Sequence, residues 1–207
     1  MNPEVVRAEQ ELAAADPVLA GLIAAAGPCP IGSGRRRRTH FEELARAVVF
    51  QQLAGRAAQA IWVRTVAVVG GRVTAPAVLA TGEATLRTAG LSGAKARALL
   101  DLADRVARGD VTLVTIGRRH DDAVIAELTR VWGIGRWTAE MFLLFQLGRL
   151  DVWPTGDLGV RTGYGRAWGL PEAPPPAELE VLGERFRPWR SIVAWYCWRA
   201  VDVVTPA

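Results

Sequence analysis

The sequence predicts an all-α protein. Half of the 207 residues are hydrophobic and alanine and leucine are abundant, a composition that favours helix. Few segments alternate β-branched with polar residues, as half-buried strands do. Glycine and proline separate stretches whose apolar residues recur at helical spacing. A chain of this length suits one domain or two small lobes that share a core.

The helices are expected in order along the chain, each bounded by turn or cap residues. Pro3 and Pro17 stand near the starts of the first two, where proline is tolerated. Residues 27–34 and 169–176 are glycine- and proline-rich and predict loops, and Asp121-Asp122 predicts an acidic cap. The predicted helices are Pro3–Ala14, Pro17–Ala26, a helix from Phe41, Ala57–Val68, Thr85–Ala89, Ala94–Arg108, Ala123–Val131, Trp137–Leu147, Ala177–Phe186 and Pro188–Val201.

The charge balance is compatible with a polyanionic partner. The formal net charge is +4 and the pI about 9.8. Of the 25 basic residues only Lys95 is a lysine. Arginine makes planar, bidentate contacts with phosphate, although a codon bias towards arginine and alanine is the favoured explanation of the ratio. The run Arg35–Arg38 is interpreted either as a solvated segment or as a contact to a DNA backbone.

The cysteines and histidines exclude several kinds of site. Two cysteines, Cys29 and Cys197, are too few for an iron–sulfur cluster or a four-cysteine zinc site. His40 and His120 show no metal-ligand spacing. No secretory signal is visible, and the apolar stretch Val18–Ala26 is far shorter than the roughly 20 residues that span a bilayer. We therefore expect a cytoplasmic protein with no membrane association.

A glycine-centred break at Gly133-Ile134-Gly135 predicts a helix–hairpin–helix over about residues 121–147. Glycines allow φ > 0 and leave backbone N–H groups uncovered, and with the start of the next helix these groups form an anion site. A DNA phosphate fits such a site without any base being read. A tight turn between helices needs glycine for structural reasons alone, which is the alternative. The predicted DNA-contacting residues of the hairpin are Gly133, Ile134, Gly135, Arg136 and Thr138.

The hairpin segment LTRVWGIGRWTAE resembles that of the helix–hairpin–helix DNA glycosylases. A second run, Asp151 to Asp157, is similar to that family's D-hydrophobic-aromatic-P-x-x-D pattern. The resemblance extends from about Phe41 to Trp198 and implies that Asp157 is the catalytic carboxylate. Asp157 is equally suited to be the N-cap of a helix starting near Leu158, and both roles are compatible. For Asp151 a structural cap is the expected role.

One carboxylate suits the implied chemistry. Breaking an N-glycosidic bond builds positive charge on the sugar, which a fixed carboxylate stabilises while it orients or deprotonates water. An alkylated purine already carries positive charge and leaves without a strong general acid. Bifunctional relatives place a Schiff-base lysine two residues after the second hairpin glycine, where this chain has Trp137. We therefore expect no lyase activity.

With tryptophan at position 137, the hairpin resembles that of the alkylation-repair branch, the DNA-3-methyladenine glycosylase II (AlkA-like) family, which has tryptophan there. Arg187-Pro188-Trp189-Arg190-Ser191 and the later Trp198 also resemble that branch. In it a flipped base stacks on aromatic walls, and a cationic base gains cation–π attraction. By position Trp137, Trp198 and Trp153 line the base pocket; the alternative for each is core packing.

The segment from Val48 to Ala58 resembles the branch's I-I-G-Q-Q-I-S-x-x-A-A. There the residue at the helix end fills the gap left by the flipped nucleotide, and Gln52 matches that wedge position. Gln51 and Gln52 are thus predicted DNA contacts, with capping or bridging of helices as the alternative. Phe50 and Ala54 depart from the usual glycine and serine.

The resemblance also implies an architecture and partners. Residues 1–207 form one glycosylase domain of two helical lobes with a cleft between them, the terminal helices completing one lobe, in a compact form without the N-terminal β-domain of longer relatives. No cofactor or iron–sulfur cluster is required; backbone carbonyls of Thr129, Val131 and Gly133 would hold a structural Na⁺ or K⁺. The expected partner is double-stranded DNA with damaged bases, bound by a monomer at a bacterial nucleoid.

The predicted function is therefore a monofunctional DNA glycosylase that flips out and excises alkylated bases of the 3-methyladenine type, leaving an abasic site. A non-catalytic damaged-DNA-binding module on the same fold is the alternative, against which Asp157 and Trp137 together argue. A bifunctional lyase for oxidised bases is disfavoured by Trp137.

Overall fold

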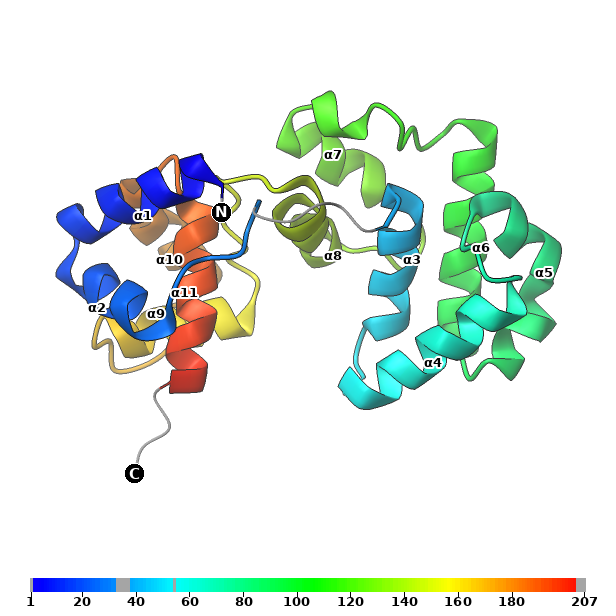
Figure 1. Ribbon diagram of the computed structural model, residues 1–207, viewed down its shortest axis with the longest axis horizontal. Helices are drawn as coiled ribbons and strands as arrows, with labels where there is room; N and C mark the ends of the chain where they lie inside the picture. The colour runs from blue at the N-terminus through cyan, green and yellow to red at the C-terminus, as the bar shows by residue number, and fades with distance from the viewer. Residues whose placement is uncertain (1, 33–37, 54, 204–207) are drawn as a thin grey trace. The chain divides into compact units, whose positions relative to one another are not determined.

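The computed structural model describes residues 2–32, 38–53 and 55–203, and these fold entirely into helices and turns (Figure 1). No strand occurs in the described ranges, and the all-α prediction is confirmed. Residues 35–37 of the arginine run and Ala54 lie outside them. The contacts group the described chain into a first unit, from Met1–Arg35 and Leu143–Ala207, and a second unit, Arg36–Phe142.

The first unit is built from helices at the two ends of the chain. Its helices are α1 (Pro3–Ala15), α2 (Pro17–Ala26), α9 (Leu158–Ala167), α10 (Pro176–Gly183), the 3₁₀ turn η3 (Glu184–Phe186) and α11 (Arg190–Val203). Asp16 ends α1 and caps α2, accepting hydrogen bonds from the Val18 and Leu19 amides. The buried Tyr196 hydroxyl of α11 lies 2.6 Å from the Glu9 carboxylate and so ties α11 to α1.

Helices α9 and α11 approach at backbone distance, at Gly163. A Cβ on Gly163 would lie 1.8 Å from the carbonyl oxygen of Cys197. Because the backbone of α9 fixes where that Cβ lies and the oxygen belongs to the backbone of α11, no side-chain rotation relieves the overlap, and the helices have to separate. Glycine is therefore required at this crossing.

Gly163→Ala is expected to lower the free energy of unfolding by about 2 kcal/mol, a usual cost of overpacking a core. Urea denaturation followed by circular dichroism measures it. Gly21→Ala is the matched control, since Gly21 lies in α2 of the same unit and a Cβ there meets nothing within 4 Å. Equal stability of the two variants would contradict the tight crossing.

The second unit contains α3 (His40–Phe50), α4 (Gly55–Val68), α5 (Ala75–Thr88), α6 (Gly93–Arg108), the 3₁₀ turn η1 (Ile116–Arg118), α7 (Asp121–Leu128) and α8 (Arg136–Met141). Thr39, Thr74 and Ser92 cap α3, α5 and α6 with their hydroxyls. The apolar faces of α3 and α6 supply much of the core.

Several predicted bounds were wrong. The predicted helix Thr85–Ala89 is only the end of α5, which starts at Ala75 and is kinked at Gly82, where φ is +71°. The helix predicted to run to Val131 ends at Leu128, and the one predicted to run to Leu147 is α-helical only to Met141 and continues as the π-helix η2 (Phe142–Leu147).

Asp121 and Asp122 are not caps. The N-cap of α7 is His120, and the two aspartates lie in the first turn, where negative charge is favourable next to uncovered helix N–H groups.

Candidate active site and hairpin

The hairpin joins α7 to α8 and depends on one glycine in the left-handed region. Gly133 has φ = +82°, and a Cβ there would lie 2.9 Å from Cβ of Ala98 on α6. Gly135 has φ = −90° and is the N-cap of α8, so the prediction of φ > 0 fails for it. At position 135 glycine leaves the N-terminus of α8 uncovered, because no atom lies within 4 Å of the place where a Cβ would be.

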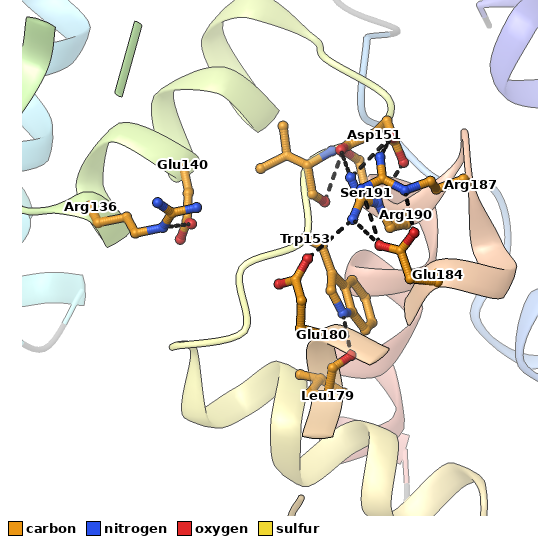
Figure 2. A network of polar contacts seen from close by, with 11 residues as sticks. Arg136, Glu140, Asp151, Trp153, Leu179, Glu180, Glu184, Arg187, Arg190 and Ser191 are labelled. Atoms are coloured by element: carbon orange, nitrogen blue, oxygen red, sulfur yellow. Dashed lines mark hydrogen bonds and ion pairs between the residues drawn. The ribbon is translucent and has the colours of Figure 1, made fainter. Parts of the chain in front are cut away.

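The other predicted hairpin contacts divide into exposed and buried. Arg136 is exposed and its Nε donates to Glu140 at 2.8 Å (Figure 2). Ile134 and Thr138 are buried, at 3% and 4% exposure. Their side chains are therefore placed to pack the hairpin, and any contact that Ile134 or Thr138 makes to a phosphate has to come from the backbone.

The carbonyls predicted to hold a cation lie along the hairpin turn. The Val131 carbonyl accepts from the Ile134 amide at 3.1 Å, and the Gly133 carbonyl accepts from Gln51 Nε2 at 3.0 Å. A carbonyl oxygen has a second lone pair, so these bonds are compatible with a cation. The site with Thr129, Val131 and Gly133 stays a prediction.

Trp137 faces a cavity of about 460 Å³ within the second unit. Trp137 is 47% exposed, whereas tryptophan is highly buried on average. The volume lies in the range of small-ligand pockets. The cavity is lined by Ala47, Phe50, Gln51, Gln52, Gly133, Trp137, Thr138 and Met141.

The two predicted DNA-contacting glutamines have different surroundings. Gln51 Nε2 donates to the Gly133 carbonyl and to Thr138 Oγ1, at 3.0 and 3.2 Å, so Gln51 bridges α3 to the hairpin, as its alternative interpretation holds. Gln52 is exposed with φ = +54°, in the left-handed region that non-glycine residues rarely adopt. An exposed side chain in such a turn is compatible with a wedge.

Asp157 is the N-cap of α9, in the first unit. Its Oδ1 accepts from the Val160 amide at 2.8 Å and from the Trp198 indole N–H at 2.9 Å. The capping interpretation is thus confirmed, and the carboxylate is only half-buried. A Cβ on Gly159 would lie 2.8 Å from Trp198 Cδ1 and 3.1 Å from Asp157 Oδ1, so glycine leaves the space in which these two side chains meet.

An exposed aromatic ring extends this arrangement. Phe145 of η2 is 53% exposed and stacks on Trp198, with ring centroids 5.8 Å apart. We call Phe145 and Trp198 the aromatic pair. Trp198 was predicted from the motif, whereas Phe145 and Gly159 were missed; an apolar ring in an apolar helix carries no sequence signal of exposure.

Trp153 is a core residue, so we withdraw it from the predicted base pocket. It is 5% exposed, its Nε1 donates to the Leu179 carbonyl at 2.8 Å, and it packs against Tyr164 and Phe186. A Cβ on Gly183 would lie 2.2 Å from Trp153 Nε1. No face of this indole is left for a base.

The loop leading to Asp157 is held by the start of α11 (Figure 2). Arg190 donates to both carboxylate oxygens of Asp151, at 2.7 and 3.1 Å, and to its carbonyl at 3.0 Å. Ser191 Oγ accepts from the Val152 amide at 2.8 Å. Asp151 therefore has a structural role, as an ion-pair partner of Arg190 and not as the cap that was predicted. We call Asp151, Arg190 and Ser191 the loop clamp.

Trp198→Phe is expected to slow the base excision that the resemblance implies at least about tenfold, because it removes an N–H bond to a charged group and keeps an aromatic ring. Single-turnover rates with saturating protein measure it. Trp195→Phe is the control, since Trp195 lies on the same helix and its ring contacts Tyr196 and Arg199. Equal rates for both variants would show that the indole N–H has no part in the reaction.

Neither thiol is placed for chemistry. Burial raises the pKa of Cys29 to about 12 and also raises the pKa of Cys197. Among the described residues no group of three or more His, Cys, Asp or Glu is placed to bind a metal. No helix in the described ranges has the length and apolar character to cross a membrane.

In a comparison with known proteins, one family model matches the part of the chain that contains both the hairpin and the Asp157 loop. Residues 45–188 match the HhH-GPD superfamily base excision DNA repair protein model. DNA-3-methyladenine glycosylase 1 of Schizosaccharomyces pombe is 32% identical over 198 residues, covering 94% of this chain and 87% of the relative.

Two solved structures are similar over nearly the whole chain. The S. pombe 3-methyladenine DNA glycosylase in complex with abasic DNA matches with a TM-score of 0.84 and 31% identity, covering 97% of this chain and 99% of that one. A DNA-3-methyladenine glycosidase from Bacillus halodurans matches with a TM-score of 0.80 and 31% identity, covering 91% and 86%. The chain belongs to the HhH-GPD superfamily of base excision DNA repair proteins.

Proposed function

We propose that this protein is a monofunctional DNA glycosylase that removes alkylated bases of the 3-methyladenine type from double-stranded DNA. The observation that carries the proposal is the Asp157 carboxylate, which accepts from a helix N–H and from the indole N–H of Trp198, the ring on which the exposed Phe145 stacks. The S. pombe relatives named for 3-methyladenine support the substrate class.

The proposed reaction assigns the chemical step to Asp157. As the bond between the base nitrogen and C1′ breaks, its electron pair leaves with the cationic base, which becomes neutral. Asp157 stabilises the positive charge that develops on the sugar, and water adds to C1′ while its proton passes to the carboxylate. The products are a free base and an abasic sugar in an unbroken strand.

Trp137 carries the second part of the proposal. Its exposed indole and the cavity it lines suit a flat, cationic base, which gains cation–π attraction on an aromatic face. The same residue stands where a lyase would carry its lysine, and Lys95, the only lysine, donates to backbone carbonyls instead. We therefore propose hydrolysis without a covalent intermediate.

The remaining assignments are proposals of the same kind. No cofactor is required, and the Thr129, Val131 and Gly133 carbonyls are the proposed ligands of a structural Na⁺ or K⁺. The proposed working form is a cytoplasmic monomer associated with the nucleoid through DNA.

A panel of duplexes tests the proposal. Purified protein is incubated with DNA that contains 3-methyladenine, 7-methylguanine, 1-methyladenine, ethenoadenine or hypoxanthine. We expect release of free alkylated base and strands that break only after alkali. Strand breakage without alkali, with borohydride trapping of a covalent adduct, would instead indicate a lyase. Retained DNA binding with no base released would indicate the non-catalytic module.

A further inference from the structure

Lys95 is bound to the end of another helix. It lies in the first turn of α6, and its Nζ donates to the carbonyls of Val49 and Gln51, at 2.8 and 2.7 Å. These carbonyls are at the C-terminus of α3, where the helix itself supplies no N–H partner. A cation at that position satisfies both acceptors and the negative end of the helix dipole.

The same face of α6 also supports the hairpin. Ala98, three residues after Lys95, contacts Gly133 so closely that a Cβ on the glycine would lie 2.9 Å from the Ala98 Cβ. Asp101, three residues further on, accepts from the Trp132 amide at 2.7 Å. Residues at this spacing lie along one side of a helix, so α6 fixes the α3 turn and the hairpin together.

Gln51 closes this set of contacts. Its carbonyl receives the Lys95 ammonium, and its side-chain amide donates to the carbonyl of Gly133 at 3.0 Å. The path Lys95–Gln51–Gly133–Ala98 thus returns to α6. Two walls of the cavity, the end of α3 and the start of α8, are held by this closed path.

The lysine side chain is committed to this role. Lys95 is half-buried, and in the contacts of the described residues its Nζ donates to two backbone oxygens and pairs with no carboxylate. Burial lowers the pKa of the Lys95 ammonium. A solvated surface lysine would show neither feature.

We propose that Lys95 is a positioning residue for base excision: by holding the carbonyls of Val49 and Gln51, it sets the turn that carries Gln52 and the cavity wall facing Trp137. This inference rests on the proposed function for its kinetic consequence. In the proposal Lys95 contacts neither a base nor a phosphate. Its loss should therefore slow base excision, and the affinity of the protein for the DNA backbone should stay nearly unchanged.

Lys95→Met tests the inference, because methionine keeps a similar length and has no donor. We expect single-turnover excision of 7-methylguanine to slow at least about tenfold, since small misplacements at a site cost one to two orders of magnitude in rate. Affinity for an undamaged duplex should change less than about threefold. Lys95→Arg, which still offers donors to both carbonyls, should recover most of the rate.

Arg108→Met is the matched control. Arg108 ends the same helix, is exposed and pairs only with surface Asp104 in the described contacts, so its loss removes one positive charge without touching the α3 turn. If Lys95→Met and Arg108→Met have the same excision rate, the inference is overturned. It is also overturned if Lys95→Met loses as much affinity as rate, because that pattern indicates a phosphate contact.

Amide hydrogen exchange separates failure of this inference from failure of the proposed function. Peptides covering residues 47–53 should exchange faster in Lys95→Met than in the wild type or Arg108→Met, whether or not any base is excised. Unchanged exchange there overturns the inference even for an active enzyme, while wild-type protein that excises nothing overturns only the proposed function. If Lys95→Met does not fold, Lys95→Gln, which keeps one donor group, is measured in the same way.

Discussion

Asp157→Asn is expected to reduce base excision by at least about 10²-fold, since removing one preorganised group that stabilises a transition state costs about 10²–10³-fold in rate. Asparagine is as good an N-cap as aspartate, and its Oδ1 can still accept the Val160 and Trp198 bonds. The variant therefore changes the charge and little else. Single-turnover release of 3-methyladenine or 7-methylguanine measures the effect, with DNA affinity measured in parallel.

The control for this prediction is Asp104, a surface aspartate of α6. Asp104→Asn removes a negative charge from a surface pair with Arg108 and should excise at the wild-type rate. Affinity of Asp157→Asn for DNA should stay equal or rise, because a carboxylate near phosphates is lost. An Asp157→Asn protein that excises normally would disprove the assignment of the catalytic carboxylate.

Arg190→Met is expected to lower the free energy of unfolding by about 3 kcal/mol, the low end of the range for breaking a buried pair. Arg190 is 7% exposed and donates three bonds to Asp151, while Glu180 and Glu184 lie within 3.5 Å of its Nη1. Removing the guanidinium takes a positive partner from Asp151, Glu180 and Glu184. In the described contacts of this cluster, Arg187 then pairs with Asp151 and Glu184. The midpoint of thermal unfolding should fall by roughly 6–12 °C.

Arg7→Met is its control, since it breaks the exposed Arg7–Glu11 pair in the same unit and should leave the free energy of unfolding nearly unchanged. The loop clamp also predicts a kinetic effect below the unfolding transition. Because the clamp holds the loop that ends at Asp157, Arg190→Met should excise at least about tenfold more slowly while still folded. If the two variants are equally stable and equally active, the clamp has no special role.

The sequence predicted those features that depend on local chemistry. Gly133, the proline starts of α1 and α2, and the spacing from the hairpin to Asp157 are all readable along the chain. The first half of α5 was missed because Pro76 and Gly82 suggest a loop, whereas Thr74 caps a helix and the glycine only kinks it.

What escaped prediction depends on contacts between distant residues. Trp137 and Trp153 are alike in sequence terms, yet one is 47% exposed and the other 5%, because only Trp153 packs against Tyr164 and Phe186. The sequence assigned no role to Lys95, although it binds carbonyls 44 and 46 residues away. Such pairings follow from how helices pack and leave no periodic signal.

The burial of both cysteines has a chemical consequence for a repair protein. Methylating agents that damage DNA bases also attack thiolates, and a thiol whose pKa is far above neutrality is almost wholly protonated. Burial raises the pKa of the Cys29 thiol to about 12 and also raises the pKa of the Cys197 thiol, so neither sulfur is present as the reactive thiolate. The protein therefore presents no reactive thiolate to the very reagents that generate its proposed substrates.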